Sequence, residues 1–146
     1  MEISLQEVPA QRIAYQSTSC AHNELGREFG RVLPIVGRAI GATMAGPPFG
    51  RYANWRESDC DVEIGAPVTE QFQAADGIEV GVLGGTRAAQ GIHVGPYTKL
   101  PEAHHEMMTW ISEQGLECKG PCWESYIDDP TQTPQDQLRT LIFYPV

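Results

Sequence analysis

Apolar residues recur with a period of two along most of the chain and with a helical period in two segments. Residues 3–17 alternate loosely between apolar and polar side chains and are rich in β-formers, which predicts a strand or a strand pair broken at Pro9. Gly84-Gly85 is typical of a turn between two further strands. The same alternation predicts strands at 51–55, 59–68, 78–83, 87–94, 121–127 and 138–144.

The first segment of helical period begins after Asn23 and stops before Gly46-Pro47. Its apolar positions are Leu25, Phe29, Val32, Leu33, Val36 and Ile40. Asn23 or Ser19 is available as the N-cap. Pro34 and Gly30 lie inside the pattern and predict a kink or a short break, because an interior proline removes a hydrogen bond and crowds the preceding turn.

The second helix is predicted from about Lys99 to Gln114. Thr98 is placed to cap it, Pro101 is tolerated in its first turn, and Gly115 is a suitable stop. One face is apolar, so we expect the helix to pack on a sheet. That face carries Leu100, Ala103, Met107, Trp110, Ile111 and Gln114.

The two halves of the chain repeat one pattern. Residues 46–52 begin with Gly-Pro and lead to Ala66-Pro67-Val68, while residues 120–126 begin with Gly-Pro and lead to Tyr144-Pro145-Val146. Each half has the order strand, helix, strand, strand, which favours the α+β class with antiparallel sheets covered by helices. We expect one domain over 1–146 with an internal duplication at about 1–72 and 73–146, because halves of this size are marginal alone. Two copies of one unit usually enclose a site between them.

Composition limits the partners. Hydrophobic residues make up 41% of the chain, as in ordinary globular proteins, and no stretch approaches the roughly 20 apolar residues that span a bilayer. The N-terminus lacks the features of a secretory signal, so a cytoplasmic location is expected. Nineteen acidic and ten basic residues give a net charge of −9, which opposes direct binding to nucleic acid or to a membrane and attracts small cations.

The sequence contains no familiar catalytic, metal or cofactor motif. It has no nucleophile elbow, no His-Glu-x-x-His, no phosphate loop and no dinucleotide fingerprint, so no cofactor is expected and no catalytic residue is assigned. The four cysteines are expected to be free thiols. Cys118, Cys122 and the pair His104-His105 raise the question of zinc, but their spacing is not that of a usual zinc site.

Glu124 is the main candidate for function. It lies in a strand-like run with Trp123 and Tyr126, and alternation puts Glu124 and Tyr126 on one face. If that face is interior, the carboxylate must be paired, hydrogen-bonded or protonated, and a cationic ligand is a natural partner. The alternatives are that Glu124 faces solvent or pairs with Arg87 or Arg139.

Aromatic residues are the second part of the candidate site. Tyr97 follows a Gly-Pro corner at a strand-to-helix junction, where it either lines the same cavity or packs structurally. Aligning the two Gly-Pro turns sets Gly50 opposite Glu124 and Tyr52 opposite Tyr126. A cavity between the halves would then have one charged wall and one aromatic or open wall with Tyr52 and Trp55, which suits an asymmetric organic cation.

Taken in order, these motifs resemble the GyrI-like small-molecule-binding domain, the effector-binding domain of bacterial multidrug-responsive transcription activators. The resemblance covers almost the whole chain. It rests on Val8 to Arg12, Gly46 to Tyr52, Asp59 to Val68, His93 to Tyr97, Gly120 to Tyr126 and Tyr144 to Val146.

The resemblance implies a pseudo-twofold tandem of two β-α-β-β modules with a ligand cleft between them. It also implies that a strand glutamate reaches lipophilic cations, and Glu124 falls on that position. Tyr97 and Tyr126 match lining positions. Tyr52, Trp55 and Phe143 are added to the predicted ligand-binding set on geometric grounds.

The resemblance leaves three functions open. The leading hypothesis is a binding protein that senses or sequesters lipophilic, cationic or aromatic small molecules, since no basic DNA-binding region precedes the first strand. The second is a hydrolase that detoxifies reactive, cyclopropane-bearing genotoxins with Glu124 as acid or base. The third is an interaction module that inhibits another protein, as some relatives inhibit DNA gyrase, so a protein partner or a homodimer also stays open.

Overall fold

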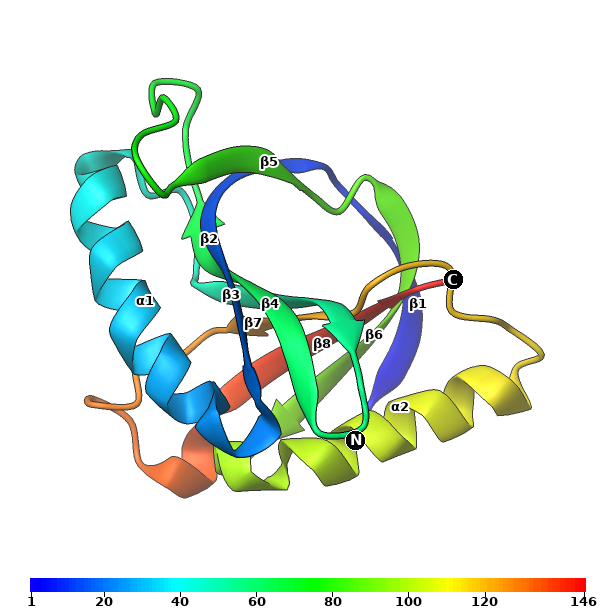
Figure 1. Ribbon diagram of the computed structural model, residues 1–146. Coiled ribbons are helices and arrows are strands. Elements are labelled where there is room, and N and C mark those ends of the chain that lie inside the picture. The colour runs from blue at the N-terminus through cyan, green and yellow to red at the C-terminus, as the bar shows by residue number, and fades with distance from the viewer. The chain divides into compact units, whose positions relative to one another are not determined.

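The computed structural model describes residues 1–146, which divide into two units. One unit is formed by residues 9–85, and the other by residues 1–8 together with residues 86–146. Each unit contains an antiparallel sheet and one long helix, as Figure 1 shows for α1 and α2. The predicted α+β class is therefore confirmed.

The unit formed by residues 9–85 has four strands in the order β3-β4-β2-β5, all paired antiparallel. Its helix packs on β2 and β4. Val32, Val36 and Ile40 of the helix are buried against Val62 and Ile64 of β4. The elements are β2 (Gln11–Ala21), α1 (Leu25–Ile40), β3 (Phe49–Trp55), β4 (Asp59–Pro67) and β5 (Glu79–Leu83).

The other unit has four strands in the order β1-β6-β8-β7, also antiparallel. Its helix buries Leu100, Ala103, Met107 and Ile111 in a cluster that includes Ile142 of the sheet. The elements are β1 (Ile3–Val8), β6 (Thr86–Val94), α2 (Leu100–Glu113), β7 (Trp123–Tyr126) and β8 (Arg139–Pro145). The apolar face predicted for the second helix therefore packs on a sheet, as expected.

The registers of the two sheets are equivalent. Gly50 pairs with Ile64 in one unit, and Glu124 pairs with Ile142 in the other. The amide of Val68 donates to the Arg12 carbonyl, as that of Val146 donates to the Arg87 carbonyl. Both units therefore contain one β-α-β-β module, β2-α1-β3-β4 and β6-α2-β7-β8, which is the structural counterpart of the repeated sequence.

The two units divide the chain differently from the halves expected at 1–72 and 73–146. The first strand of the chain, β1, pairs with β6, and β5 pairs back onto β2. Each module thus gains one edge strand that alternation alone cannot assign to a partner, because alternation shows which face of a strand is buried and not which strand lies beside it. The ligand cleft expected between the halves stays a prediction.

The short break predicted inside the first helix is wrong, and the alternative of a kink stays a prediction. The helix α1 continues from Leu25 to Ile40 with Pro34 inside it. Proline cannot donate to the carbonyl four residues earlier, which here belongs to Gly30. Both residues are exposed, so water can hydrate the unused carbonyl, and glycine adds no side chain to the crowded turn.

The predicted N-caps are also wrong. Neither helix has a side-chain cap, so Ser19, Asn23 and Thr98 do not play that role. A 3₁₀ turn precedes each helix instead, at His22–Glu24 and at Tyr97–Lys99, and supplies the first hydrogen bonds from the backbone. Pro101 in the first turn of α2 is as predicted, and Gly115 follows that helix with a φ of 69°.

Gly65 provides a test of how closely β4 and β2 approach. A Cβ added there would lie 1.9 Å from the Ala14 carbonyl oxygen, whereas one added at the exposed helical Gly37 would meet nothing within 4 Å. We expect Gly65→Ala to lower the free energy of unfolding by about 3 kcal/mol or more, because backbone must move. We expect Gly37→Ala to raise it by about 0.5–1 kcal/mol. Urea unfolding of both variants checks this, and a Gly65→Ala protein as stable as the parent would contradict it.

Candidate functional site

Glu124 lies on the helix-covered face of the sheet formed by β1, β6, β8 and β7. Its Cα partner on β8 is Ile142, which belongs to the buried cluster under α2. Only 2% of Glu124 is exposed, and Thr140 is the one other buried polar or charged residue of the chain. The alternative in which Glu124 faces solvent is therefore wrong.

A chain of hydrogen bonds holds the Glu124 carboxylate. The Tyr126 hydroxyl donates to Oε1 over 2.7 Å, and His104 Nε2 lies 2.7 Å from Oε2. The other ring nitrogen of His104, Nδ1, lies 2.6 Å from the Tyr144 hydroxyl. An ionised carboxylate only accepts, so Nε2 carries a proton and donates it to Glu124. The four side chains come from α2, β7 and β8.

Burial keeps the neighbouring acidic groups protonated. It raises the pKa of the Tyr144 phenol far above its ordinary value, with nearby Cys122 and Glu124 adding to the effect. It also raises the pKa of the Cys122 thiol to about 12, with the charge of Glu124 as the next cause. Both groups are therefore neutral hydrogen-bonding partners at physiological pH.

Aromatic rings lie beside the carboxylate. Tyr97 and Tyr126 are in edge-to-face contact, with ring centroids 5.6 Å apart and an interplanar angle of 70°. Burial raises the pKa of Tyr97, and the charges of Asp128, Asp129 and Glu124 act in the same direction. Both tyrosines are half-buried. The structure therefore brings Glu124, Tyr126 and Tyr97 together within one unit.

Phe143 is not beside Glu124. It pairs with Trp123 across β7 and β8, and the two rings stack at 4.8 Å. Because adjacent strand residues point to opposite faces, Phe143 and Trp123 occupy the face of the sheet opposite Glu124. Phe143 contributes to this unit through packing on that face.

Tyr52 and Trp55 belong to the unit of residues 9–85. Trp55 is 58% exposed and stacks on His22, with ring centroids 4.0 Å apart. Tyr52 makes an edge-to-face contact with Trp55 at 5.5 Å. The two residues form an aromatic group with His22, and their role as ligand contacts stays a prediction.

Sequence reasoning missed His104 and Tyr144 as members of this site. His104 lies four residues after Leu100 and three before Met107, so it flanks the apolar stripe of α2. That spacing was the available signal for its inward position. Tyr144 appeared only as the first residue of Tyr-Pro-Val, the counterpart of Ala66-Pro67-Val68. The hydrogen bond between His104 and Tyr144 joins a helix and a strand that are 40 residues apart in the chain.

The three carboxylates of β4 form ion pairs with arginines. Asp59 and Asp61 on β4 pair with Arg56, and Glu63 pairs with Arg51. Arg56 lowers the pKa of Asp61 well below its usual range. Arg139, which we considered as a partner of Glu124, pairs with Asp128 at 2.9 Å.

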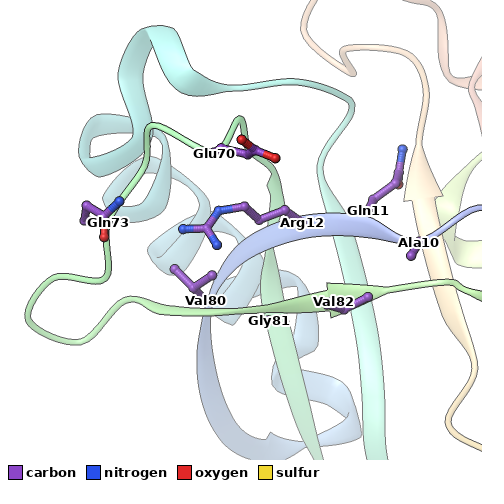
Figure 2. Close-up of a pocket in the computed structure, with 8 residues that line it drawn as sticks. All are labelled: Ala10, Gln11, Arg12, Glu70, Gln73, Val80, Gly81 and Val82. Atoms are coloured by element: carbon purple, nitrogen blue, oxygen red, sulfur yellow. The ribbon is translucent and has the colours of Figure 1, made fainter.

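A separate hollow of about 720 Å³ lies within the unit of residues 9–85. Figure 2 shows the Arg12 side chain running between Glu70 and Val80 towards Gln73. Arg12 donates to the Phe72 carbonyl at 2.6 Å, while its buried Nε has no hydrogen-bond partner. None of the predicted ligand-binding residues lines this hollow. Its lining is Ala10, Gln11, Arg12, Glu70, Gln73, Val80, Gly81 and Val82.

No three metal-ligating side chains come together in the structure to hold a metal ion. All four cysteines are free thiols. Neither helix is both long and apolar enough to cross a bilayer.

The thiols should differ sharply in reactivity. Cys118 is exposed, whereas burial raises the pKa of Cys60 to about 11 and that of Cys122 to about 12. At pH 8 a thiol of pKa 12 is ionised in about one molecule in ten thousand, and the thiolate is the nucleophile. We expect iodoacetamide to modify Cys118 in the native protein and to spare Cys60 and Cys122 until denaturant is added. Peptide mass spectrometry reports the order, and early labelling of Cys122 would contradict the buried site.

Comparison with solved structures supports the fold. The chain resembles the EcmrR C-terminal domain with a TM-score of 0.82 and 23% identity, over 99% of this chain and 96% of that one. The structure of EcmrR in a complex with DNA gives a TM-score of 0.86 and 23% identity over 99% of this chain. This chain spans 56% of the length of that EcmrR chain.

Two more distant structures share the fold. SAV2435 bound to tetraphenylphosphonium has a TM-score of 0.72 and 15% identity, over 100% of this chain and 94% of that one. A hydrolase from Listeria innocua has a TM-score of 0.62 and 14% identity, over 99% and 91% of the two chains. No curated protein matches the sequence. The family described as the GyrI-like small molecule binding domain matches residues 1–146, and the chain belongs to that family.

Proposed function

We propose that this chain binds lipophilic organic cations that carry aromatic groups, with Glu124 as the charged contact and Tyr126 and Tyr97 as aromatic contacts. The observation that carries the proposal is a carboxylate that is 2% exposed and held by His104 and Tyr126. Membership in a family of small-molecule-binding domains supports it. So does the tetraphenylphosphonium bound to a protein of the same fold.

Burial is what makes one carboxylate effective. Coulomb attraction is several times stronger near a protein interior than in water, and Glu124 does not have to be stripped of bulk water when a cation arrives. The two hydrogen bonds from His104 and Tyr126 fix the direction of both oxygens. The site therefore presents a preorganised negative charge.

The expected ligand has a delocalised or shielded charge. A small, strongly hydrated ammonium ion would lose much solvation on entering such a site, whereas a cation shielded by aromatic groups loses little. Each aromatic ring facing the cation adds roughly 0.5–2 kcal/mol. The edge-to-face pair of Tyr97 and Tyr126 supplies such rings beside Glu124.

Hydrolysis is the second candidate, and one observation favours it. The hydrogen-bonded series Tyr126, Glu124, His104 and Tyr144 contains groups that accept and donate protons. A carboxylate paired with an imidazole can activate water as a general base. In this case the substrate would be a reactive hydrophobic toxin, such as a cyclopropane-bearing alkylator, attacked by that water.

A pair of ions of like shape and opposite charge tests the binding proposal. Tetraphenylphosphonium should raise the melting temperature of the protein, because a ligand at 100 times its Kd stabilises the folded state by about 2.7 kcal/mol. Tetraphenylborate in sodium buffer should give no shift. Equal stabilisation by both ions would show that apolar contact, and not the charge of Glu124, governs binding.

Glu124→Gln tests the residue. The amide keeps the shape of the side chain and removes its charge, so we expect the affinity for tetraphenylphosphonium to fall at least about tenfold in calorimetry, equivalent to about 1.4 kcal/mol. Glu63→Gln is the matched control, because it removes the same charge from a strand carboxylate that is paired with Arg51. Equal losses in the two variants would contradict a specific role for Glu124.

Incubation of the protein with electrophilic natural products, followed by mass spectrometry of the compounds, separates binding from hydrolysis. Capture predicts compounds of unchanged mass. Hydrolysis predicts a gain of one water that disappears in Glu124→Gln. Turnover that persists in that variant would contradict the second candidate.

A further inference from the structure

We propose that His104 sets the charge of the cation site, so that a ligand cation binds at Glu124 with release of a proton from the imidazole. This inference rests on the proposed function and adds a proton linkage to it. It also makes His104 a positioning and selectivity residue, because it acts on the ligand through Glu124.

Both ring nitrogens of His104 are engaged. The side chain is 20% exposed and reaches from α2 to Glu124, whose side chain is 3% exposed. Nε2 contacts Glu124 Oε2 at 2.7 Å, and Nδ1 contacts the Tyr144 hydroxyl at 2.6 Å. The ring is therefore held at two points, and its position does not depend on its charge.

The surroundings offer hydrogen-bond partners to both the neutral ring and the protonated ring. In the neutral form, Nε2–H donates to Glu124 and Nδ1 accepts from the Tyr144 hydroxyl. In the protonated form, Nδ1–H donates to the Tyr144 oxygen, and the phenolic hydrogen turns towards the neighbouring Cys122 thiol. Rotation of one hydroxyl exchanges the two arrangements, so both imidazole nitrogens have a partner in either form.

The two forms differ in the charge they offer to a ligand. With neutral His104 the pair carries the negative charge of Glu124, and with protonated His104 the pair is a neutral ion pair. A cation at Glu124 therefore favours the neutral ring. Because binding and proton release are linked, affinity must rise with pH while the ring titrates and level off above that range.

The other titratable groups near His104 do not supply this dependence. Cys122 and Tyr144 have raised pKa values and stay protonated at neutral pH. Asp128 and Asp129, in the segment after β7, act on Tyr97 through their charges. Arg139 lowers the pKa of Asp128, and Thr131 lowers that of Asp129, so both carboxylates stay ionised.

Two further elements contribute no competing charge. On β7 the facing groups are Glu124 itself and the Tyr126 phenol. On α2 the positions one turn away are Leu100, Pro101, Met107 and Met108, which are uncharged. Histidine is the side chain that ordinarily changes charge between pH 5 and 8.

Calorimetry with tetraphenylphosphonium from pH 5.5 to 8, in two buffers of different ionisation enthalpy, tests the inference. The parent protein should release up to about one proton at the acid end and none at pH 8, and its affinity should fall by up to about tenfold per pH unit on the acid side. His104→Gln should bind with the same affinity at every pH, because an amide can donate at the Nε2 position and does not titrate. His105→Gln, at an exposed position on the same helix, should retain the parent profile.

Tyr144→Phe provides a second variant that keeps the ring of residue 144. It removes the acceptor for the second imidazole proton, and an unpaired charged donor costs more than an unpaired neutral acceptor. The acid limb of the affinity profile, which is the pH range where affinity falls as the pH is lowered, should therefore move to lower pH by about one unit.

The outcomes separate the two proposals. Tetraphenylphosphonium binding that is independent of pH in the parent, or an acid limb that persists in His104→Gln, overturns the proton linkage and leaves the proposed function intact. Absence of binding at every pH overturns the proposed function and this inference with it. An acid limb lost in His104→Gln and shifted in Tyr144→Phe supports both.

Discussion

The hydrogen bond between His104 and Glu124 is the interaction on which the proposed function depends. A carboxylate that is 2% exposed is stable in a protein only if donors satisfy its oxygens. Two of these donors are an imidazole and a phenol, and neither carries a fixed positive charge. The proposed function uses the negative charge of Glu124 when His104 is neutral.

The duplicated module explains why there is one such carboxylate. Gly50 and Glu124 occupy equivalent register positions, opposite Ile64 and Ile142 on the neighbouring strands. The second module adds His104 from its helix and Tyr144 from its last strand. The position equivalent to Tyr144 in the first module is Ala66, because Ala66 pairs with Ala14 as Tyr144 pairs with Ala89. The same backbone thus serves as plain core in one unit and as a polar network in the other.

Local pattern predicted most of the fold. The two helices, the strand interruption at Pro9 and the placement of Glu124 and Tyr126 on one face follow from periodicity and turn chemistry, whereas the burial of that face does not. The partners of the edge strands β1 and β5 could not be predicted, because alternation does not specify which strands are neighbours. The helix caps were wrong because backbone 3₁₀ turns replaced side-chain caps.

For the site, the sequence indicated Glu124, Tyr126 and Tyr97 but not the residues that hold the carboxylate. Phe143 was predicted as a ligand contact, and as the neighbour of Ile142 on β8 it lies on the face of the sheet opposite Glu124. His104 was considered only as a metal ligand, since its partner lies 20 residues away on another element. Long-range hydrogen bonds of this kind depend on packing and leave little trace in local sequence.

The most direct test of the central claim is a crystal structure of the protein with tetraphenylphosphonium. The account predicts the phosphonium centre within about 6 Å of the Glu124 carboxylate, with a phenyl group against Tyr97 or Tyr126. A ligand seated elsewhere, with Glu124 hydrogen-bonded as before and touching nothing of the cation, would contradict it.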